Sequence, residues 1–198
     1  MKIRKIIILL YKFKILKRII PTTLKVFVKF FLIKEIKIIH NDLIFLLNPN
    51  NPIDREIYLK DKYESDQITF LEKKIEENDI KIFIDIGAHM GFYSINLSKK
   101  KINIYSFEPI LENFTQLKKN ILVNKIYNIK TYNCALSNIR KLVTMWVPDK
   151  NRTGGFAIFN KDDEALKKYE MKNVNTKVIQ SDIGDNLLDI KKSIIAIK

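Results

Sequence analysis

A short apolar run that leads directly into a glycine turn constrains the fold more than any other stretch. The segment 82–86 is β-branched or aromatic apart from Asp85, which is typical of a strand buried on both faces of a parallel sheet. Gly87 and Gly91 follow, and a helical pattern then extends through Ser98. Glycine permits a sharp turn, and the helix N-terminus behind it offers free N–H groups to a polar ligand. The stretch therefore predicts strand, binding turn and helix in an α/β sheet.

A second strand with an acid at its end completes one strand–helix–strand unit. The segment 102–107 has a strand pattern, and Glu108 follows it, 23 residues after Asp85. A carboxylate in that position can accept hydrogen bonds from ribose hydroxyls. The sequence therefore predicts a site for a nucleoside-containing cofactor. The alternative is that Asp85 and Glu108 are only caps on an α/β fold that binds no nucleotide.

The glycine spacing favours S-adenosylmethionine over NAD. A dinucleotide site has the pattern G-x-G-x-x-G, so that the backbone can approach a pyrophosphate. Here Ala88 and His89 replace part of that spacing, and Asp85 lies within the turn. A carboxylate would repel a pyrophosphate, but it can hold the ammonium group of an amino-acid tail. S-adenosylmethionine has such a tail and no phosphate.

These residues, in this order, resemble the FkbM family of class I S-adenosylmethionine-dependent methyltransferases. The matching stretches are 83–94, 106–109, 113–124 and 133–137, and the resemblance covers about residues 55–198. It implies transfer of a methyl group to a hydroxyl oxygen, on a sugar, a glycan or another hydroxyl-bearing acceptor.

The resemblance also assigns cofactor contacts. It implies that Gly87, Ala88 and Gly91 border the methionine part and that Glu108 binds the ribose. It places Asn133 and Ala135 beside the adenine. We expect His89 to contact the cofactor or the backbone, with a role as general base as the alternative. The catalytic residue stays unassigned.

The implied fold is a Rossmann-like α/β fold of the class I methyltransferase type. We expect a parallel sheet in the order 3-2-1-4, with strands near 82–86, 103–107, 129–132 and 193–197. In the family, the fourth strand continues into a Lys-x-Asp-x-Glu-Gly segment and three further strands. The match here stops at Lys198, so we expect a C-terminally truncated member. The alternative function is an inactive truncated fragment that retains partial cofactor binding and a membrane-surface helix.

Weaker patterns predict the remaining elements. The segments 142–147 and 156–159 resemble a hairpin, which is either a surface feature or part of an acceptor pocket. A further strand is expected at 176–180, and a turn or short helix at 182–188. Ahead of the cofactor domain (81–198), the region 41–80 is expected to hold a strand at 43–47 and a helix from Ser65 or Asp66 to Asn78.

The basic charge of the chain is concentrated at its N-terminus. The formal net charge is +14, and residues 1–40 hold eleven Lys or Arg and one Glu. The rest is nearly balanced, which argues against a nucleic-acid partner. Two basic amphipathic helices joined at Pro21 are expected, the second carrying Phe27 and Phe30. Either they lie on an anionic membrane surface, or they form a cap packed on the core.

The compartment and metal content follow from what the sequence lacks. The apolar runs are far shorter than the roughly 20 residues that span a bilayer, and no signal peptide is recognisable. We therefore expect a cytoplasmic protein, with peripheral attachment to the inner membrane face as the alternative. One cysteine, Cys134, and two histidines leave no ligand set for zinc, so no metal site is expected.

Overall fold

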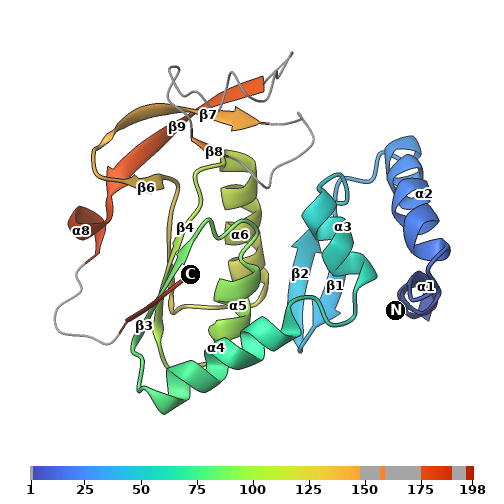
Figure 1. Ribbon diagram of the computed structural model, residues 1–198, viewed down its shortest axis with the longest axis horizontal. Coiled ribbons are helices and arrows are strands. Elements are labelled where there is room, and N and C mark those ends of the chain that lie inside the picture. The colour runs from blue at the N-terminus through green and yellow to red at the C-terminus, as the bar shows by residue number, and fades with distance from the viewer. Residues whose placement is uncertain (1, 148–156, 159–174, 189–194) are drawn as a thin grey trace. The chain divides into compact units, whose positions relative to one another are not determined.

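The computed structural model describes residues 2–147, 157–158, 175–188 and 195–198 (Figure 1). The chain divides into two compact units, Met1–Gln67 and Ile68–Lys198. Each unit is described by itself below.

The first unit combines three helices with a two-stranded hairpin. Its elements are α1 (Lys2–Tyr11), α2 (Leu16–Phe30), β1 (Ile36–His40), β2 (Leu43–Leu47) and α3 (Pro52–Leu59). The strands pair antiparallel around Asn41 and Asp42, which both have positive φ angles (49° and 62°). Asn and Asp tolerate this conformation, which two-residue hairpin turns require. Asn51 then caps α3 by accepting a hydrogen bond from Ile53 N at 2.9 Å.

The strand predicted at 43–47 is therefore confirmed as β2, but its partner β1 was not predicted. The prediction that a helix ends at Pro21 is wrong. The first helix, α1, ends at Tyr11, and Pro21 lies inside the second helix, α2. The carbonyl that a proline leaves without its donor is that of residue i−4, here Lys17, in the first turn of α2. The helix continues past Pro21 and buries Val28.

The second unit contains the predicted parallel sheet. Its strands are β3 (Ile82–Ile86), β4 (Asn103–Phe107), β5 (Ile129–Tyr132) and β10 (Ile195–Ile197). All three neighbouring pairs are parallel, and the spatial order is β5-β4-β3-β10. This confirms the order 3-2-1-4 and the Rossmann-like α/β fold. Residues 193–194 of the expected fourth strand lie outside the described residues.

Both faces of this sheet are covered. On one face, Phe83 and Ile104 pack with Ile75 of α4 (Ser65–Glu77) and Leu97 of α5 (Phe92–Leu97). On the opposite face, Ile84 and Phe107 pack with Cys134, which follows β5, and with Leu187. Residues 82–85 of β3 are buried, which explains why this strand lacks polar alternation. α6 (Leu111–Val123) connects β4 to β5 and packs against β5.

A second, mixed sheet was only partly predicted. It contains β6 (Ala135–Ser137), β7 (Lys141–Val147), β8 (Ala157–Ile158) and β9 (Asn175–Ile183), in the order β6-β9-β7-β8. The antiparallel pairing of β7 with β8 confirms the hairpin, whose connection 148–156 lies outside the described residues. The strand expected at 176–180 is part of β9, and α8 (Gly184–Leu187) is the short helix expected near its end. The parallel pairing of β9 with β6 was not predicted.

Among the residues that the structure describes, no helix combines the length and the apolar character that crossing a bilayer requires.

Candidate functional site

The glycine turn joins the carboxyl ends of β3 and β4. The N–H groups of Gly87 and Ala88 both donate to the carbonyl oxygen of Phe107, each at 2.9 Å. Gly91 N–H donates to the carbonyl of Ala88 at 2.8 Å and closes the turn. The backbone needs positive φ angles of 77° at Gly87, 54° at His89 and 89° at Gly91. Glycine adopts such angles without a steric penalty, which explains its place at both ends of the turn.

The two glycines have different surroundings. A Cβ atom on Gly91 would lie 2.4 Å from Cδ1 of Leu117, which is fully buried in α6. Gly91 therefore allows α5 to start close against α6. A Cβ on Gly87 would meet no atom within 4 Å, and Gly87 is exposed. The space beside Gly87 is therefore open to a ligand.

Glu108 lies at the end of β4, and its carboxylate faces the same turn. Its Oε2 accepts a hydrogen bond from His89 N–H at 2.8 Å. Its Oε1 accepts from Ile110 N–H at 2.9 Å and from Asn113 Nδ2 at 3.3 Å. A carboxylate can accept about four hydrogen bonds. Among the described residues Oε2 has a single donor, so this oxygen can accept one more bond.

Burial of the Glu108 carboxyl raises its pKa above the ordinary value, and the two backbone N–H groups and Asn113 offset part of that rise. Glu108 is only 4% exposed, so its carboxyl has little water to replace its protein partners. A ligand hydroxyl at Oε2 would add a donor and favour the ionised form. The arrangement therefore suits an uncharged donor such as a ribose hydroxyl.

Asp85 is fully buried below the turn, and it already has partners. Its Oδ2 accepts from Ser94 Oγ at 2.6 Å, and Ser94 Oγ also lies 2.7 Å from Ser106 Oγ. Its Oδ1 lies 3.1 Å from the ammonium nitrogen of Lys198. Sequence analysis assigned Asp85 to the ammonium of an amino-acid tail. The structure places a lysine ammonium against that carboxylate instead.

Lys198 also contacts the first turn of α5. Its ammonium nitrogen lies 4.4 Å from the ring centroid of Tyr93, within cation–π range. Burial and the nearby Lys198 charge lower the pKa of His89 to about 4. His89 is therefore a neutral imidazole at pH 7. Its backbone N–H, rather than its ring, makes the contact with Glu108.

The two residues expected beside an adenine differ in position. Asn133 is exposed and donates from Nδ2 to the backbone carbonyl of Glu108 at 2.8 Å. It therefore lies at the same edge of the sheet as the turn. Ala135 packs with Ile110, Met145 and Ile179 in a cluster that includes the second sheet. Ala135 contributes to the packing behind Ile110, two residues after Glu108.

The polar residues that support the site were not predicted from the sequence. Ser94 of α5 donates a hydrogen bond to Asp85, and Ser106 of β4 hydrogen-bonds to Ser94. Asn120 donates from Nδ2 to the carbonyl of Met90 at 3.0 Å and holds the end of the turn against α6. A signal was present, because Asn113 and Asn120 are buried seven residues apart on α6. No comparable signal marked Lys198 as a partner of Asp85.

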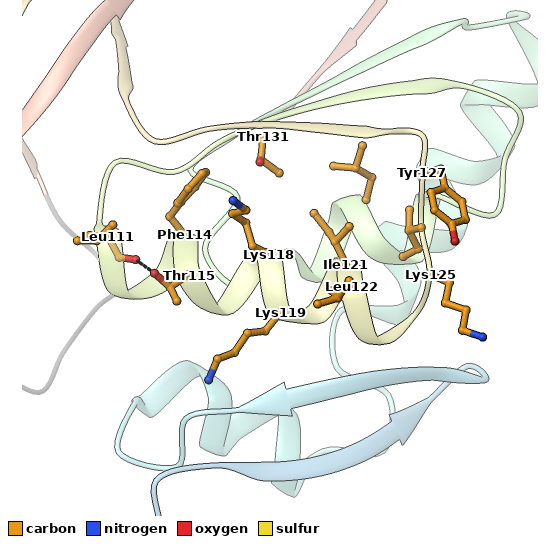
Figure 2. Close-up of a pocket in the computed structure, with 12 residues that line it drawn as sticks. Leu111, Phe114, Thr115, Lys118, Lys119, Ile121, Leu122, Lys125, Tyr127 and Thr131 are labelled. Carbon is orange, nitrogen blue, oxygen red and sulfur yellow. Dashed lines mark hydrogen bonds between the residues drawn. The ribbon is translucent and has the colours of Figure 1, made fainter.

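The site does not coincide with a groove that runs along α6. That groove has a volume of about 800 Å³, and its lining contains none of the described residues of the glycine turn. Figure 2 shows Phe114, Lys118 and Ile121 extending from α6 toward the strand that carries Thr131. Within the described residues no group of three or more His, Cys, Asp or Glu side chains could hold a metal ion.

Comparisons with known proteins give no close relative. No family model and no curated protein matches the chain. One solved structure that resembles it is a putative transferase of Pyrococcus horikoshii (16% identity, TM-score 0.37, 52% of this chain and 37% of that chain). A second is the tRNA (uracil-54, C5)-methyltransferase of Pyrococcus abyssi with S-adenosyl-L-homocysteine (18%, TM-score 0.36, 50% and 24%). A third is the tRNA m1G37 methyltransferase of M. jannaschii (17%, TM-score 0.35, 55% and 36%).

The chain thus covers between 24% and 37% of the length of these three proteins. At these identities and TM-scores the likeness adds nothing to what the sheet order itself defines. The functional argument therefore depends on the geometry of the turn and Glu108.

Proposed function

We propose that this chain binds S-adenosylmethionine at the glycine turn and belongs to the class I methyltransferases, within the FkbM family. The proposed reaction is transfer of the methyl group to a hydroxyl oxygen of a sugar or glycan. The bound cofactor would supply an activated methyl group, and the residues of the chain would orient it and exclude water.

One observation carries the proposal: the carboxylate of Glu108 is held beside the turn with acceptor capacity left at Oε2. The backbone N–H groups of His89 and Ile110 hold this carboxylate in place, so its orientation is set before a ligand binds. A preorganised acceptor of this kind suits a hydroxyl of a ribose. Gly87 leaves the space next to the carboxylate without a side chain.

The ion pair of Asp85 with Lys198 refines the role proposed for Asp85. A buried carboxylate that holds one ammonium group at 3.1 Å has the chemistry to attract another. We propose that the methionine ammonium approaches the turn near Asp85 and shares or displaces Lys198. The charge of Lys198 also lowers the repulsion of a pyrophosphate, so NAD has to be included as a competing ligand.

Calorimetric titration of the full chain with S-adenosylmethionine and with NAD tests the proposal. We expect S-adenosylmethionine to bind and Glu108→Gln to weaken binding by about 10- to 100-fold, because a charged acceptor is lost. Glu112→Gln is the matched control, because Glu112 is exposed on α6 and pairs with Lys177. Equal affinity of wild type and Glu108→Gln would remove Glu108 from the site. Preferential binding of NAD would exclude the methyltransferase assignment.

The acceptor is tested separately, with a labelled methyl group. Incorporation into a saccharide pool, but not into bulk tRNA, would support the sugar O-methyltransferase. Binding of S-adenosylmethionine without transfer to either pool would favour the alternative of a non-catalytic, cofactor-binding fragment. Transfer to tRNA alone would overturn the sugar assignment and the expectation that nucleic acid is not a partner.

A further inference from the structure

The first two helices expose an unusual amount of apolar surface. In the described part of the chain, 22 large apolar side chains are exposed, and twelve of them lie within residues 3–32. These twelve are Ile3, Ile6, Leu9, Leu10, Phe13, Ile15, Ile19, Val26, Phe27, Phe30, Phe31 and Leu32, here called the N-terminal apolar surface. Phe30 is 79% exposed and Leu32 80%. Apolar surface this extensive marks a site that contacts another apolar phase or partner.

This surface is not the face by which the helices pack within their own unit. The inward face of α1 carries Arg4, which donates to the carbonyls of Tyr58 at 3.0 Å and Ile57 at 3.3 Å. α2 buries Val28, which is 1% exposed. Both helices therefore contact their unit through other residues and leave the N-terminal apolar surface exposed to solvent.

Cations without partners accompany the exposed apolar side chains. The exposed cations are Lys5, Lys12, Lys14, Lys17, Arg18, Lys25 and Lys29. None of these seven forms an ion pair with a residue in the part of the chain that the structure describes. A partner for this region must therefore be apolar and negatively charged at once.

Four lysines also converge on one concave site of this unit. A cavity of about 360 Å³ is lined by Lys12, Lys17, Lys60 and Lys62, with Asp61 as the one acid of its lining. Lys60 pairs with Glu56, which leaves the other three cations to attract an anion. A phosphate of a lipid headgroup has the charge and size for this cavity.

We propose that α1 and α2 lie on the surface of a bilayer that contains anionic phospholipids. The N-terminal apolar surface enters the interface between headgroups and acyl chains, and the exposed lysines contact phosphates. The lysine cavity holds one headgroup. This attachment does not depend on what the glycine turn binds.

Co-sedimentation of the full chain with vesicles tests the proposal. We expect at least about tenfold tighter binding to phosphatidylcholine vesicles that contain phosphatidylglycerol than to pure phosphatidylcholine, with a loss of binding at high salt. Lys25→Gln should weaken binding about fivefold, since one cation near the membrane is lost. The double variant Val26→Ser/Phe30→Ser should weaken it tenfold or more. The side chains at all three substituted positions are exposed, so we expect these variants to fold.

Matched variants outside the helices serve as controls. Lys101→Gln removes an exposed lysine of the second unit, and Val178→Ser/Phe70→Ser removes two exposed apolar side chains of the same types. Neither should change vesicle binding. Equal binding to neutral and anionic vesicles, or equal losses in the controls, would overturn the proposal. The wild type could instead fail to bind vesicles and self-associate, with the self-association lost in Val26→Ser/Phe30→Ser. That outcome would show that the N-terminal apolar surface binds a second copy of the chain.

Discussion

The ammonium nitrogen of Lys198 lies 3.1 Å from the carboxylate of Asp85, 113 residues earlier in the chain. The backbone explains this placement. Lys198 N–H donates to the carbonyl of Ile84 at 3.0 Å, and Ile86 N–H donates to the carbonyl of Lys198 at 3.1 Å. The parallel ladder of β10 with β3 therefore extends to Lys198 and sets its side chain beside Asp85. The pair links the two strands between which the order of the sheet reverses, where open α/β sheets bind their ligands.

We expect this pair to stabilise the fold. Lys198→Met should lower the free energy of unfolding by about 1–3 kcal/mol, because Asp85 would be left buried without its cation. In the double variant with Asp85→Asn the loss should be smaller than the sum of the single losses. Urea unfolding of the four proteins measures this coupling. Lys81→Met, which breaks the exposed pair of Lys81 with Asp79, should cost below about 1 kcal/mol. Strict additivity would show that Lys198 and Asp85 do not interact.

The two turn glycines should differ in their tolerance of alanine. Gly91→Ala should cost about 2–5 kcal/mol, because the new Cβ clashes with Leu117 and the φ angle of 89° is strained. Gly87→Ala meets open space, so it should cost only the backbone strain, about 1–2 kcal/mol. Gly184→Ala, with no atom closer than 3.8 Å, is the control. Thermal unfolding measures these losses. A larger loss of stability in Gly87→Ala than in Gly91→Ala would contradict the prediction.

The histidine of the turn should make stability depend on pH. The pKa of His89 falls from 6.5 to about 4 on folding, so between these values the unfolded chain binds the proton and the folded chain does not. Stability from this group is present above pH 6.5 and is lost as the pH falls toward 4. His89 is partly exposed, so we expect a loss of about 1–2 kcal/mol.

His89→Asn isolates this effect, because Asn tolerates the φ angle of 54° at this position. The difference in unfolding free energy between wild type and His89→Asn should change by that amount between pH 7 and pH 4.5. Burial also raises the pKa of Glu108, but Glu108 is present in both proteins, so its titration drops out of the difference. A difference that stays constant with pH would mean that His89 is not held neutral.

Arg4 should anchor α1 to the C-terminus of α3. Its guanidinium donates to carbonyls of the last turn of α3 and stacks on the ring of Tyr58 at 5.7 Å. Charged donors stabilise such carbonyls, so Arg4→Ala should lower stability by about 1–3 kcal/mol. Lys5→Ala, one residue further on an exposed position, should cost less than about 0.5 kcal/mol. Hydrogen exchange of α1 amides would show whether the helix is released in Arg4→Ala.

The parallel sheet could be predicted because its evidence is local. Buried strands lack polar alternation, and the spacing from Asp85 to Glu108 fits one crossover, so β3 and β4 follow from the sequence. β5 and the order of the strands were expected from the family resemblance. The pairing of β6 with β9 could not be predicted in the same way. Ala135 meets Ser181 across 46 residues, and no local pattern identifies a partner at that distance.

The glycine turn, with its positive φ angles at Gly87 and Gly91, and the acid at Glu108 were determined by the sequence alone. Glycine and a strand-end carboxylate have these properties in any parallel α/β context. Tertiary structure decided which groups pair: Lys198 with Asp85, and His89 N–H with Glu108. The position of Pro21 inside α2 was also known only from the structure. Such contacts depend on which distant segments pack together. Local propensity carries no information about them, since burial and pairing are properties of the whole fold.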